Sequence, residues 1–255
     1  MNNKLNMKKQ IFIVISALLI SLLIGIMITG AKPSNKIVEV PPHAVEIAPG
    51  VFDLGTTVVK GKSVQGYMFI DYKKGFTHKP NHNGGGAGGT SCFAFLSQGA
   101  RWKATEPYVL DTANSDGMNS SFVEIFTEAS LDAWDSQVAF EIFGNRNISN
   151  VVDGADTSAP DNKNEILFGG IAEPGAIAVT IVWGFFSGPP STRELIEFDA
   201  VFDDPDFLWG DAGPTSEASL GNTSIMDYNN IAAHEFGHAA GMGHPSDSCT
   251  EETEY

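Results

Sequence analysis

The stretch that organises this chain is His234-Glu235-Phe236-Gly237-His238-Ala239-Ala240-Gly241-Met242-Gly243-His244. In a helix, His234 and His238 lie one turn apart on the same face, so both imidazoles can reach one metal ion. Gly241 tolerates positive φ, so it can end the helix and turn the backbone to deliver His244 as a third ligand. Three histidines and one water are the open tetrahedral set expected of catalytic zinc.

Glu235 directly follows the first histidine. Consecutive helical residues are offset by about 100°, so its carboxylate is not required as a ligand and can face a water in the open position of the metal. We therefore expect Glu235 to be a general base, and His234, His238 and His244 to bind Zn2+. A His-Glu-x-x-His pattern alone also occurs by chance on ordinary helices. The glycine and the third histidine at the required offsets favour the metal site.

The whole string, with the proline that follows it, resembles the extended zinc-binding motif of the metzincin metallopeptidases, and it looks most like the matrixin branch. The resemblance implies a zinc endopeptidase that hydrolyses protein or peptide substrates, with Glu235 as the base. It also implies a methionine turn and a C-terminal subdomain downstream. No methionine follows Met242, Glu254 stands where the turn is expected, and that subdomain is nearly absent. The alternative is therefore a catalytically inactive, truncated secreted protein that binds zinc or peptide.

Composition narrows the classes of partner. The chain has 255 residues, 42% of them hydrophobic, which is ample for a buried core. A net charge of −16 argues against nucleic acid and anionic membrane surfaces, because both would repel the protein. The cluster Asp203-Asp204-Pro205-Asp206 could bind Ca2+ through carboxylate oxygens, although a solvated acidic loop has the same composition.

Residues 1–31 are expected to be a signal peptide or a signal anchor. Lysines at positions 4, 8 and 9 precede an apolar run from Ile11 to Thr29, and Thr29-Gly30-Ala31 offers small residues for cleavage. As a helix the run is also long enough to cross a bilayer, so an uncleaved anchor is the alternative. The lysines favour a cytoplasmic N-terminus, which makes the rest of the chain secreted or anchored with its catalytic domain outside.

Two domains are expected after this segment. Residues 32–89 form an N-terminal extension and glycine-rich linker, with a small hairpin-like module between Val51 and Tyr72, and residues 90–255 form the matrixin-like catalytic domain. His78 and His82 share the i, i+4 spacing, but Pro80 and the following glycines disfavour a metal-binding helix there.

Cys92 and Cys249 fit an extracellular disulfide. Matrixin pro-segments instead carry an inhibitory zinc-binding cysteine, but Cys92 lacks the proline, arginine and glycine that surround it there. We therefore favour the disulfide over the zinc thiolate.

The remaining pattern predicts an α/β (α+β) fold with a twisted, mostly parallel sheet and two main helices, the second carrying the zinc motif. A helix is expected around Phe122 to Ala133, capped by Ser120 or Ser121, and the zinc helix is capped by Asn229 or Asn230. The expected strands are 92–96, 107–111, 138–143, 165–171, 176–183 and 195–203, the last with one solvated face.

This order of elements also resembles the upper subdomain of metzincins. The resemblance implies that Ala176 to Trp183 is an edge strand, along which a peptide substrate lies by β-augmentation. Trp209 is expected to anchor the core or a loop.

Overall fold

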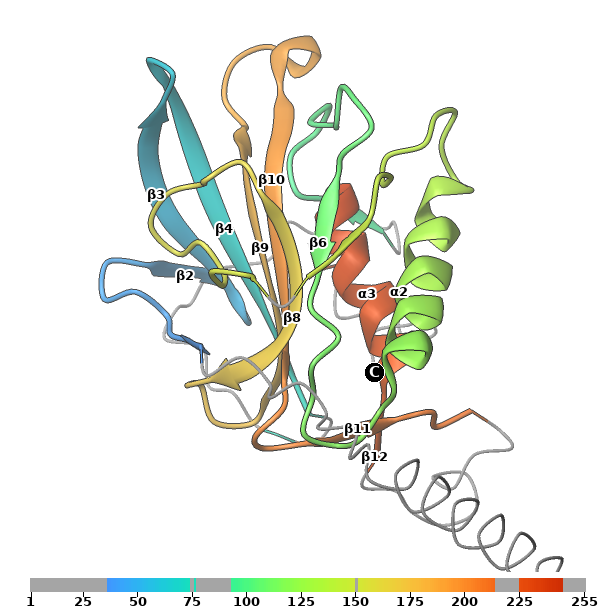
Figure 1. The fold of residues 1–255 in the computed structure, drawn as a ribbon. Coiled ribbons are helices and arrows are strands. Elements are labelled where there is room, and N and C mark those ends of the chain that lie inside the picture. Colours follow the sequence, from blue (N-terminus) through green and yellow to red (C-terminus); the bar gives the residue numbers. More distant parts are fainter. Residues whose placement is uncertain (1–35, 74–75, 77–92, 150, 214–224, 245–255) are drawn as a thin grey trace, which may run out of the picture. The chain divides into compact units, whose positions relative to one another are not determined.

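The computed structural model describes residues 36–73, 76, 93–149, 151–213 and 225–244 (Figure 1). The chain divides into two compact units, Met1–Gly30 and Ala31–Tyr255, and every described residue lies in the second. The predictions for the signal segment, the glycine-rich linker, the Cys92–Cys249 disulfide, the His78 and His82 pair, and the segment after His244 lie outside the described residues. Among those described, no helix combines the length and apolar character needed to cross a bilayer.

An open, twisted sheet of nine strands with two helices forms the core of this mixed α/β unit (Figure 1). The strands of the sheet are β1 (Ile37–Val38), β2 (Val45–Ala48), β3 (Val51–Val59), β4 (Lys62–Tyr72), β6 (Tyr108–Leu110), β7 (Asn147–Ile148), β8 (Asn164–Ile171), β9 (Ala176–Phe185) and β10 (Glu194–Asp203). Eight of them follow the order β2-β3-β4-β9-β10-β8-β6-β7, and β1 pairs with β8. Two short pairs lie outside the sheet: β5 (Ala94–Phe95) with β13 (Met242–Gly243), and β11 (Leu208–Gly210) with β12 (Ile225–Asp227). A 3-10 turn, η1 (Pro190–Thr192), precedes β10.

The two halves of the sheet differ in strand direction. β1, β6, β7, β8 and β10 pair in parallel, whereas β2, β3, β4 and β9 pair antiparallel, and β9 is also antiparallel to β10. The expectation of a mostly parallel sheet is therefore right for one half and wrong for the other. The cause is the β3–β4 hairpin, in which Lys60 and Gly61 take positive φ and turn the chain straight back. The hairpin assigned from the sequence to an N-terminal extension thus continues the same sheet.

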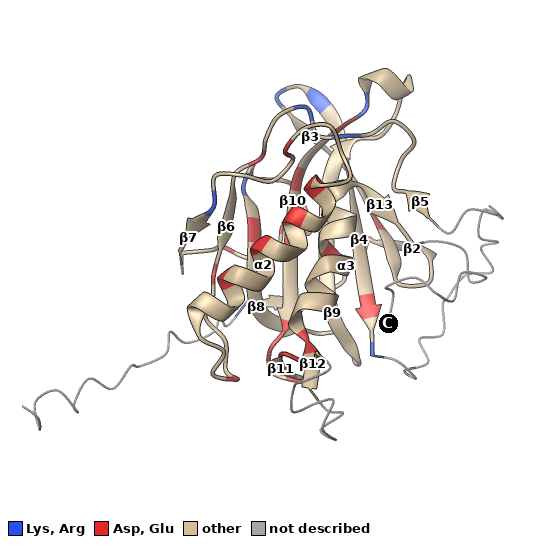
Figure 2. Ribbon diagram, turned by 90° about the vertical axis from the view of Figure 1, so that its right-hand side faces the viewer, with Lys and Arg blue, Asp and Glu red and all other residues tan. Residues whose placement is uncertain are grey.

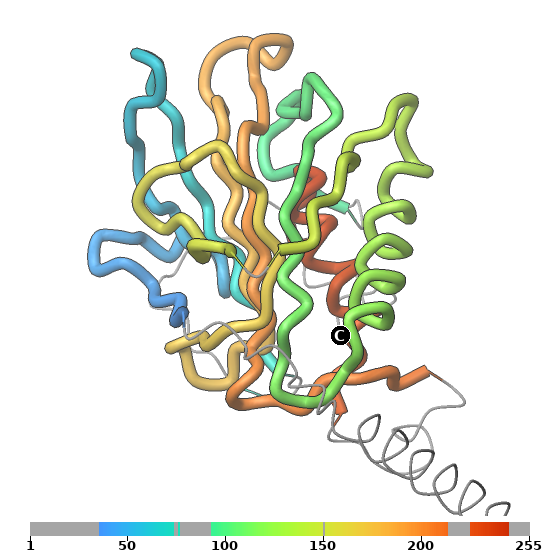
Figure 3. The backbone as a smooth tube through the Cα atoms, in the orientation of Figure 1, coloured from blue at the N-terminus to red at the C-terminus, as the bar shows by residue number. Residues whose placement is uncertain are grey.

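The prediction that Ala176 to Trp183 forms an edge strand is wrong. β9 lies between β4 and β10, with Thr180 opposite Phe69 on one side and opposite Ala200 on the other. Nine of its ten residues are buried. The family resemblance implied that a peptide would pair with this strand, but β4 of the β3–β4 hairpin pairs with it instead. The tube trace shows β4 running beside β9 (Figure 3).

The sheet buries both of its faces because side chains alternate along each strand. Phe69, Phe168 and Phe202 belong to the core that packs against the two helices, and Trp209 is buried in the same core as expected. Met68 and Leu167, their sequence neighbours, belong to a second core on the opposite face. The central strands are therefore covered on both faces, which explains why all eight residues of β8 are buried.

Two helices, α2 (Ser120–Asp135) and α3 (Tyr228–Ala240), pack against each other in this core (Figure 1). The residues that cap the N-termini of both helices differ from those predicted. Asn119 caps α2 by accepting from the Phe122 N–H at 2.9 Å, and Asp227 caps α3 by accepting from the Asn230 N–H at 3.2 Å. Both have extended φ and ψ, which leaves the side-chain oxygen free to reach the first turn.

Three side chains of α2 form hydrogen bonds with α3. The Thr127 and Tyr228 hydroxyls lie 2.7 Å apart, Ser130 Oγ donates to the Asn229 carbonyl at 3.1 Å, and Trp134 Nε1 donates to the Ala233 carbonyl at 2.7 Å. The position of the zinc-motif helix is therefore fixed along its N-terminal half.

Two further expectations about strands fail. Residues 138–143 form no strand, and Phe143 makes only a single bridge with Glu106. β10 has no solvated face, because Glu197, Asp199 and Asp203 are buried with the apolar residues between them. Their carboxylates accept backbone N–H groups: Glu197 that of Asn162, Asp199 those of Asp156 and Glu165, and Asp203 that of Ile171. Alternation of charge along a strand indicates solvent only when no neighbouring loop supplies donors.

Candidate metal centre

The three predicted histidines meet at the C-terminal end of α3. His234 and His238 lie one turn apart on the helix, with their Nε2 atoms 3.1 Å from each other. Gly241 ends the helix with φ of 104°, in the left-handed region that a residue with a Cβ rarely adopts. β13 then pairs with β5, and this pairing holds the returning chain so that the His244 ring lies 4.7 Å from the His238 ring, centroid to centroid.

Contacts around His238 set the direction of its lone pair. Its Nδ1 lies 3.1 Å from the Met242 carbonyl oxygen. A carbonyl oxygen can only accept, so Nδ1 carries the proton and Nε2 presents its lone pair to the other two histidines. The Phe69 ring stacks on the imidazole with centroids 4.1 Å apart and planes 10° apart. The ring is therefore held in the orientation that a metal ligand requires.

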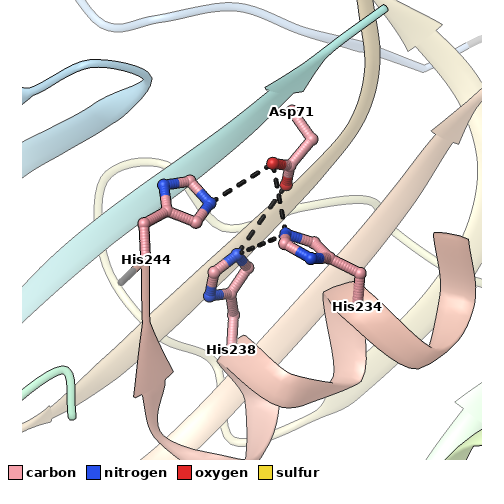
Figure 4. Close-up of side chains that lie close together, drawn as sticks. All are labelled: Asp71, His234, His238 and His244. Atoms are coloured by element: carbon pink, nitrogen blue, oxygen red, sulfur yellow. Dashed lines mark hydrogen bonds and ion pairs between the residues drawn. The ribbon is translucent and has the colours of Figure 1, made fainter. Parts of the chain in front are cut away.

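A fourth group, Asp71, faces the three imidazoles, and the sequence reasoning missed it (Figure 4). It comes from β4, at the opposite end of the described chain from α3. Its Oδ1 lies 3.2 Å from His234 Nε2 and 3.3 Å from His244 Nε2, and its Oδ2 lies 3.7 Å from His238 Nε2. Asp71 and Phe69 are two residues apart on the strand, so both point to the α3 side of the sheet.

Glu235 is fully buried beside the histidines. Thr180, in the middle of β9, donates from its hydroxyl to Glu235 Oε2 at 2.6 Å, and this bond fixes the carboxyl group. The other oxygen, Oε1, has no hydrogen-bond partner among the described residues. Glu235 also lies close enough to Asp71 for the two carboxyl groups to affect each other's protonation. The residue predicted to be the base is thus buried, hydrogen-bonded to β9 and close to Asp71.

Burial and neighbouring charges shift the pKa values of Glu235, Asp71 and His238 in different directions. Burial raises the pKa of Glu235 well above its usual range, and the neighbouring Asp71 carboxylate raises it further. Burial alone would also raise the pKa of Asp71, but the charges of His234 and His244 and a hydrogen bond from His234 lower it well below its usual range. Burial lowers the pKa of His238 to about 4, so this imidazole is neutral at physiological pH, as a metal ligand must be.

The four donor groups fit a single metal ion. One ligand atom from each of Asp71, His234, His238 and His244 lies within 4.8 Å of the other three. Ligand atoms that surround one tetrahedral ion at 2.0–2.1 Å lie about 3.3 Å apart, and the contacts of 3.1, 3.2, 3.3 and 3.7 Å bracket that value. Among the described residues, Asp71 Oδ2 and His244 Nε2 are also buried without a hydrogen-bond partner, which is costly unless a cation satisfies them. The cluster can therefore hold a metal ion.

The acidic cluster that was predicted to bind calcium accepts hydrogen bonds from backbone N–H groups. Asp203 Oδ1 accepts the Ile171 N–H, and the Asp204 carboxylate accepts the Ser115 N–H at 2.9 and 3.1 Å. Within the described residues, the other group with metal-ligand spacing is Asp156, Glu197 and Asp199. Acidic side chains are spread along α2 and the strands (Figure 2), so carboxylate clusters are expected from composition alone. Calcium binding remains a prediction.

The structure thus brings Glu235 and all three predicted ligands together and adds Asp71. One signal in the sequence points to Asp71, because it is the charged residue within the otherwise apolar strand Met68-Phe69-Ile70-Asp71-Tyr72. Such a residue needs a partner, but the sequence does not say which one. In comparisons with known proteins, no family model matches this chain, and no curated protein is significantly similar to it.

Proposed function

We propose that this protein is a secreted or membrane-anchored zinc-dependent endopeptidase of the metzincin type, similar to matrixins. The observation that carries the proposal is the convergence of three imidazoles from α3 and its C-terminal turn on one point beside a rigidly held glutamate. Three neutral nitrogen donors favour zinc over calcium or magnesium, which prefer oxygen ligands. A bound zinc ion would supply a water of lowered pKa and would polarise a carbonyl group.

Glu235, Thr180 and the three histidines each have a separate role in the proposed hydrolysis. Glu235 takes a proton from the attacking water and passes it to the leaving amine as the peptide bond breaks. Thr180 keeps the carboxyl group in place through its 2.6 Å hydrogen bond, and His234, His238 and His244 would hold the metal. The substrate class is a protein or peptide.

A second candidate is a zinc-binding protein without catalytic activity. The observation that favours it is Asp71, since three histidines and one carboxylate already make a complete tetrahedral set. Closed four-ligand sites are typical of structural zinc. This candidate also matches the alternative drawn from the sequence, in which the protein binds zinc or peptide without hydrolysing it.

The two candidates differ in chelator-sensitive proteolysis. We expect the full chain to bind one zinc ion, and we expect cleavage of an unfolded protein such as casein to stop when 1,10-phenanthroline is added. Glu235→Gln removes the base but keeps the shape and the hydrogen bond from Thr180, so it should bind zinc normally and lose about 100- to 10,000-fold in hydrolysis rate. The exposed Glu141→Gln should hydrolyse casein like the wild type.

Two results would overturn the peptidase proposal. One is hydrolysis by Glu235→Gln at the wild-type rate. The other is stoichiometric zinc without chelator-sensitive cleavage, both in the wild type and in variants that lack the Asp71 carboxylate.

A further inference from the structure

A short two-stranded ribbon lies beside the metal centre. It consists of β5 and β13, which pair antiparallel with Phe95 opposite Met242 (Figure 2). Continuing this register by two residues in each strand places Phe93 opposite His244. The ribbon therefore carries one of the three histidines, and Phe93 is the cross-strand neighbour of that histidine.

The two faces of the ribbon have different surroundings. Leu96, whose backbone N–H donates to the Gly241 carbonyl at 2.9 Å, packs against the core beneath the ribbon. Side chains alternate along a strand, so Phe93 and Phe95 project to the opposite, outer face. Residues opposite each other in a pair of strands project to the same side, so His244 belongs to the outer face as well. The outer face is therefore continuous with the metal centre through His244.

Two large aromatic side chains are exposed to water on this outer face. Phe93 is 57% exposed and Phe95 is 58% exposed, and their rings pack edge to face with centroids 5.6 Å apart. Met242, opposite Phe95, is half-buried, and none of the three side chains carries a charge. Single exposed apolar residues are ordinary, but a contiguous group of them beside a candidate site indicates a ligand with an apolar surface.

We propose that Phe93, Phe95 and Met242 form the part of the substrate site that binds a large apolar side chain of the peptide. The inference rests on the proposed peptidase function and specifies which peptides the site selects. Because β9 is paired on both of its edges, contacts to the substrate are needed from other elements around the metal. The ribbon is such an element, since it already delivers His244 to the cluster.

The spacing of the ribbon limits which substrate residue reaches the rings. Side chains opposite each other on paired strands lie about 5 Å apart, and an extended peptide advances about 3.3 Å per residue. Phe93 is the cross-strand neighbour of a metal-binding histidine. A substrate side chain that covers the two rings therefore belongs to a residue within about three positions of the cleaved bond.

The test compares the full-length wild type with the double variant Phe93→Ala/Phe95→Ala and with Phe140→Ala, which removes an exposed phenylalanine outside the ribbon. Circular dichroism and zinc content check that each protein is folded and binds metal. Phe93→Ala alone, which lies just outside β5, replaces the double variant if the latter does not fold. Each protein then digests denatured casein, and mass spectrometry of the products identifies the residues on both sides of every cleaved bond. Binding to immobilised casein is measured separately in the Glu235→Gln background, where it does not depend on turnover.

We expect wild-type cleavage sites to carry a large apolar residue at one fixed position within three residues of the cleaved bond. This enrichment should fall at least about fivefold in the double variant, and casein binding should weaken at least about tenfold, because covering one such side chain contributes that much to affinity. Zinc content should not change, and Phe140→Ala should behave like the wild type. An unaltered cleavage-site preference in the folded double variant would refute the proposal and leave the peptidase function standing.

Two further outcomes separate the remaining possibilities. If none of the proteins cleaves casein but the double variant binds it at least about tenfold more weakly than the wild type does, the ribbon binds peptide and the peptidase proposal fails. Light scattering during size-exclusion chromatography detects the other possible occupant, a second copy of the chain. A wild-type dimer that the double variant dissociates, with unchanged cleavage sites, would overturn the proposal, because the outer face would then be a self-association interface.

Discussion

Gly237 allows α3 to approach α2, and its substitution by alanine should destabilise the protein although alanine is the better helix former. A Cβ at this position would lie 2.6 Å from Trp134 Cζ2, closer than real Cβ atoms come to another heavy atom. The indole cannot easily yield, because its Nε1 donates to the Ala233 carbonyl at 2.7 Å. Gly237 also lies directly before His238, so any shift of the helix moves the metal ligands.

Helix propensity and overpacking act in opposite directions on the stability of Gly237→Ala, so their relative sizes decide whether the substitution stabilises or destabilises the protein. Replacing glycine by alanine inside a helix gains about 1 kcal/mol from propensity. Overpacking a close-packed interior costs about 1–3 kcal/mol, and a clash with a ring held by a hydrogen bond belongs in the upper part of that range. We therefore expect Gly237→Ala to lower the free energy of unfolding by about 1–2 kcal/mol. For a domain of this size the melting temperature should fall by roughly 2–8 °C.

The assay is a double-mutant cycle with Trp134→Phe, measured by urea denaturation of the metal-free protein. Phenylalanine lacks the outer ring atoms that meet the new methyl group, so in that background Gly237→Ala should be neutral or stabilising. The coupling between the two positions should be about 1–3 kcal/mol. Gly237→Ala that stabilises the wild-type background, or that costs the same in both backgrounds, would refute the argument from the Trp134 contact.

Two further predictions concern stability away from the metal ligands. Burial and the nearby Asp156 raise the pKa of Glu197 to about 9, and burial raises the pKa of Glu165 to about 7, from 4.5. Stability from these protonated groups is complete below about pH 4 and is lost as the pH rises through 7 and 9, so with a chelator present the melting temperature should fall from pH 5 to pH 8. Glu197→Gln should flatten that dependence, and an equally steep fall in this variant would count against Glu197. Trp102 is buried, and its indole N–H donates to the Ala239 carbonyl at 2.8 Å. Trp102→Phe leaves that carbonyl unpaired, so it should lower the free energy of unfolding, measured by urea denaturation, by about 1–3 kcal/mol. A loss below a few tenths of a kcal/mol would show that water replaces the bond.

Local chemistry explains why part of the site could be predicted. His234, Glu235 and His238 are placed by one helix, and Gly241 and His244 follow within a single turn of chain. α2 is likewise visible as a periodic apolar pattern, and the long strands β8, β9 and β10 are visible as apolar segments. The capping residues were harder to identify, because several polar residues precede each helix. Only the backbone geometry at Asn119 and Asp227 selects the side chain that reaches the first turn.

The sequence by itself therefore determined the grouping of three histidines, the adjacent Glu235 and the mixed α/β class, since each depends on residues close together in the chain. Tertiary structure alone decided that β9 is an interior strand, that the carboxylates of β10 are buried, and that Asp71 meets histidines more than 160 residues away. Strand pairing sets these features, and the pairing of β4 with β9 depends on register and burial rather than on any local pattern. The same pairing adds a fourth possible ligand, Asp71, to the three histidines.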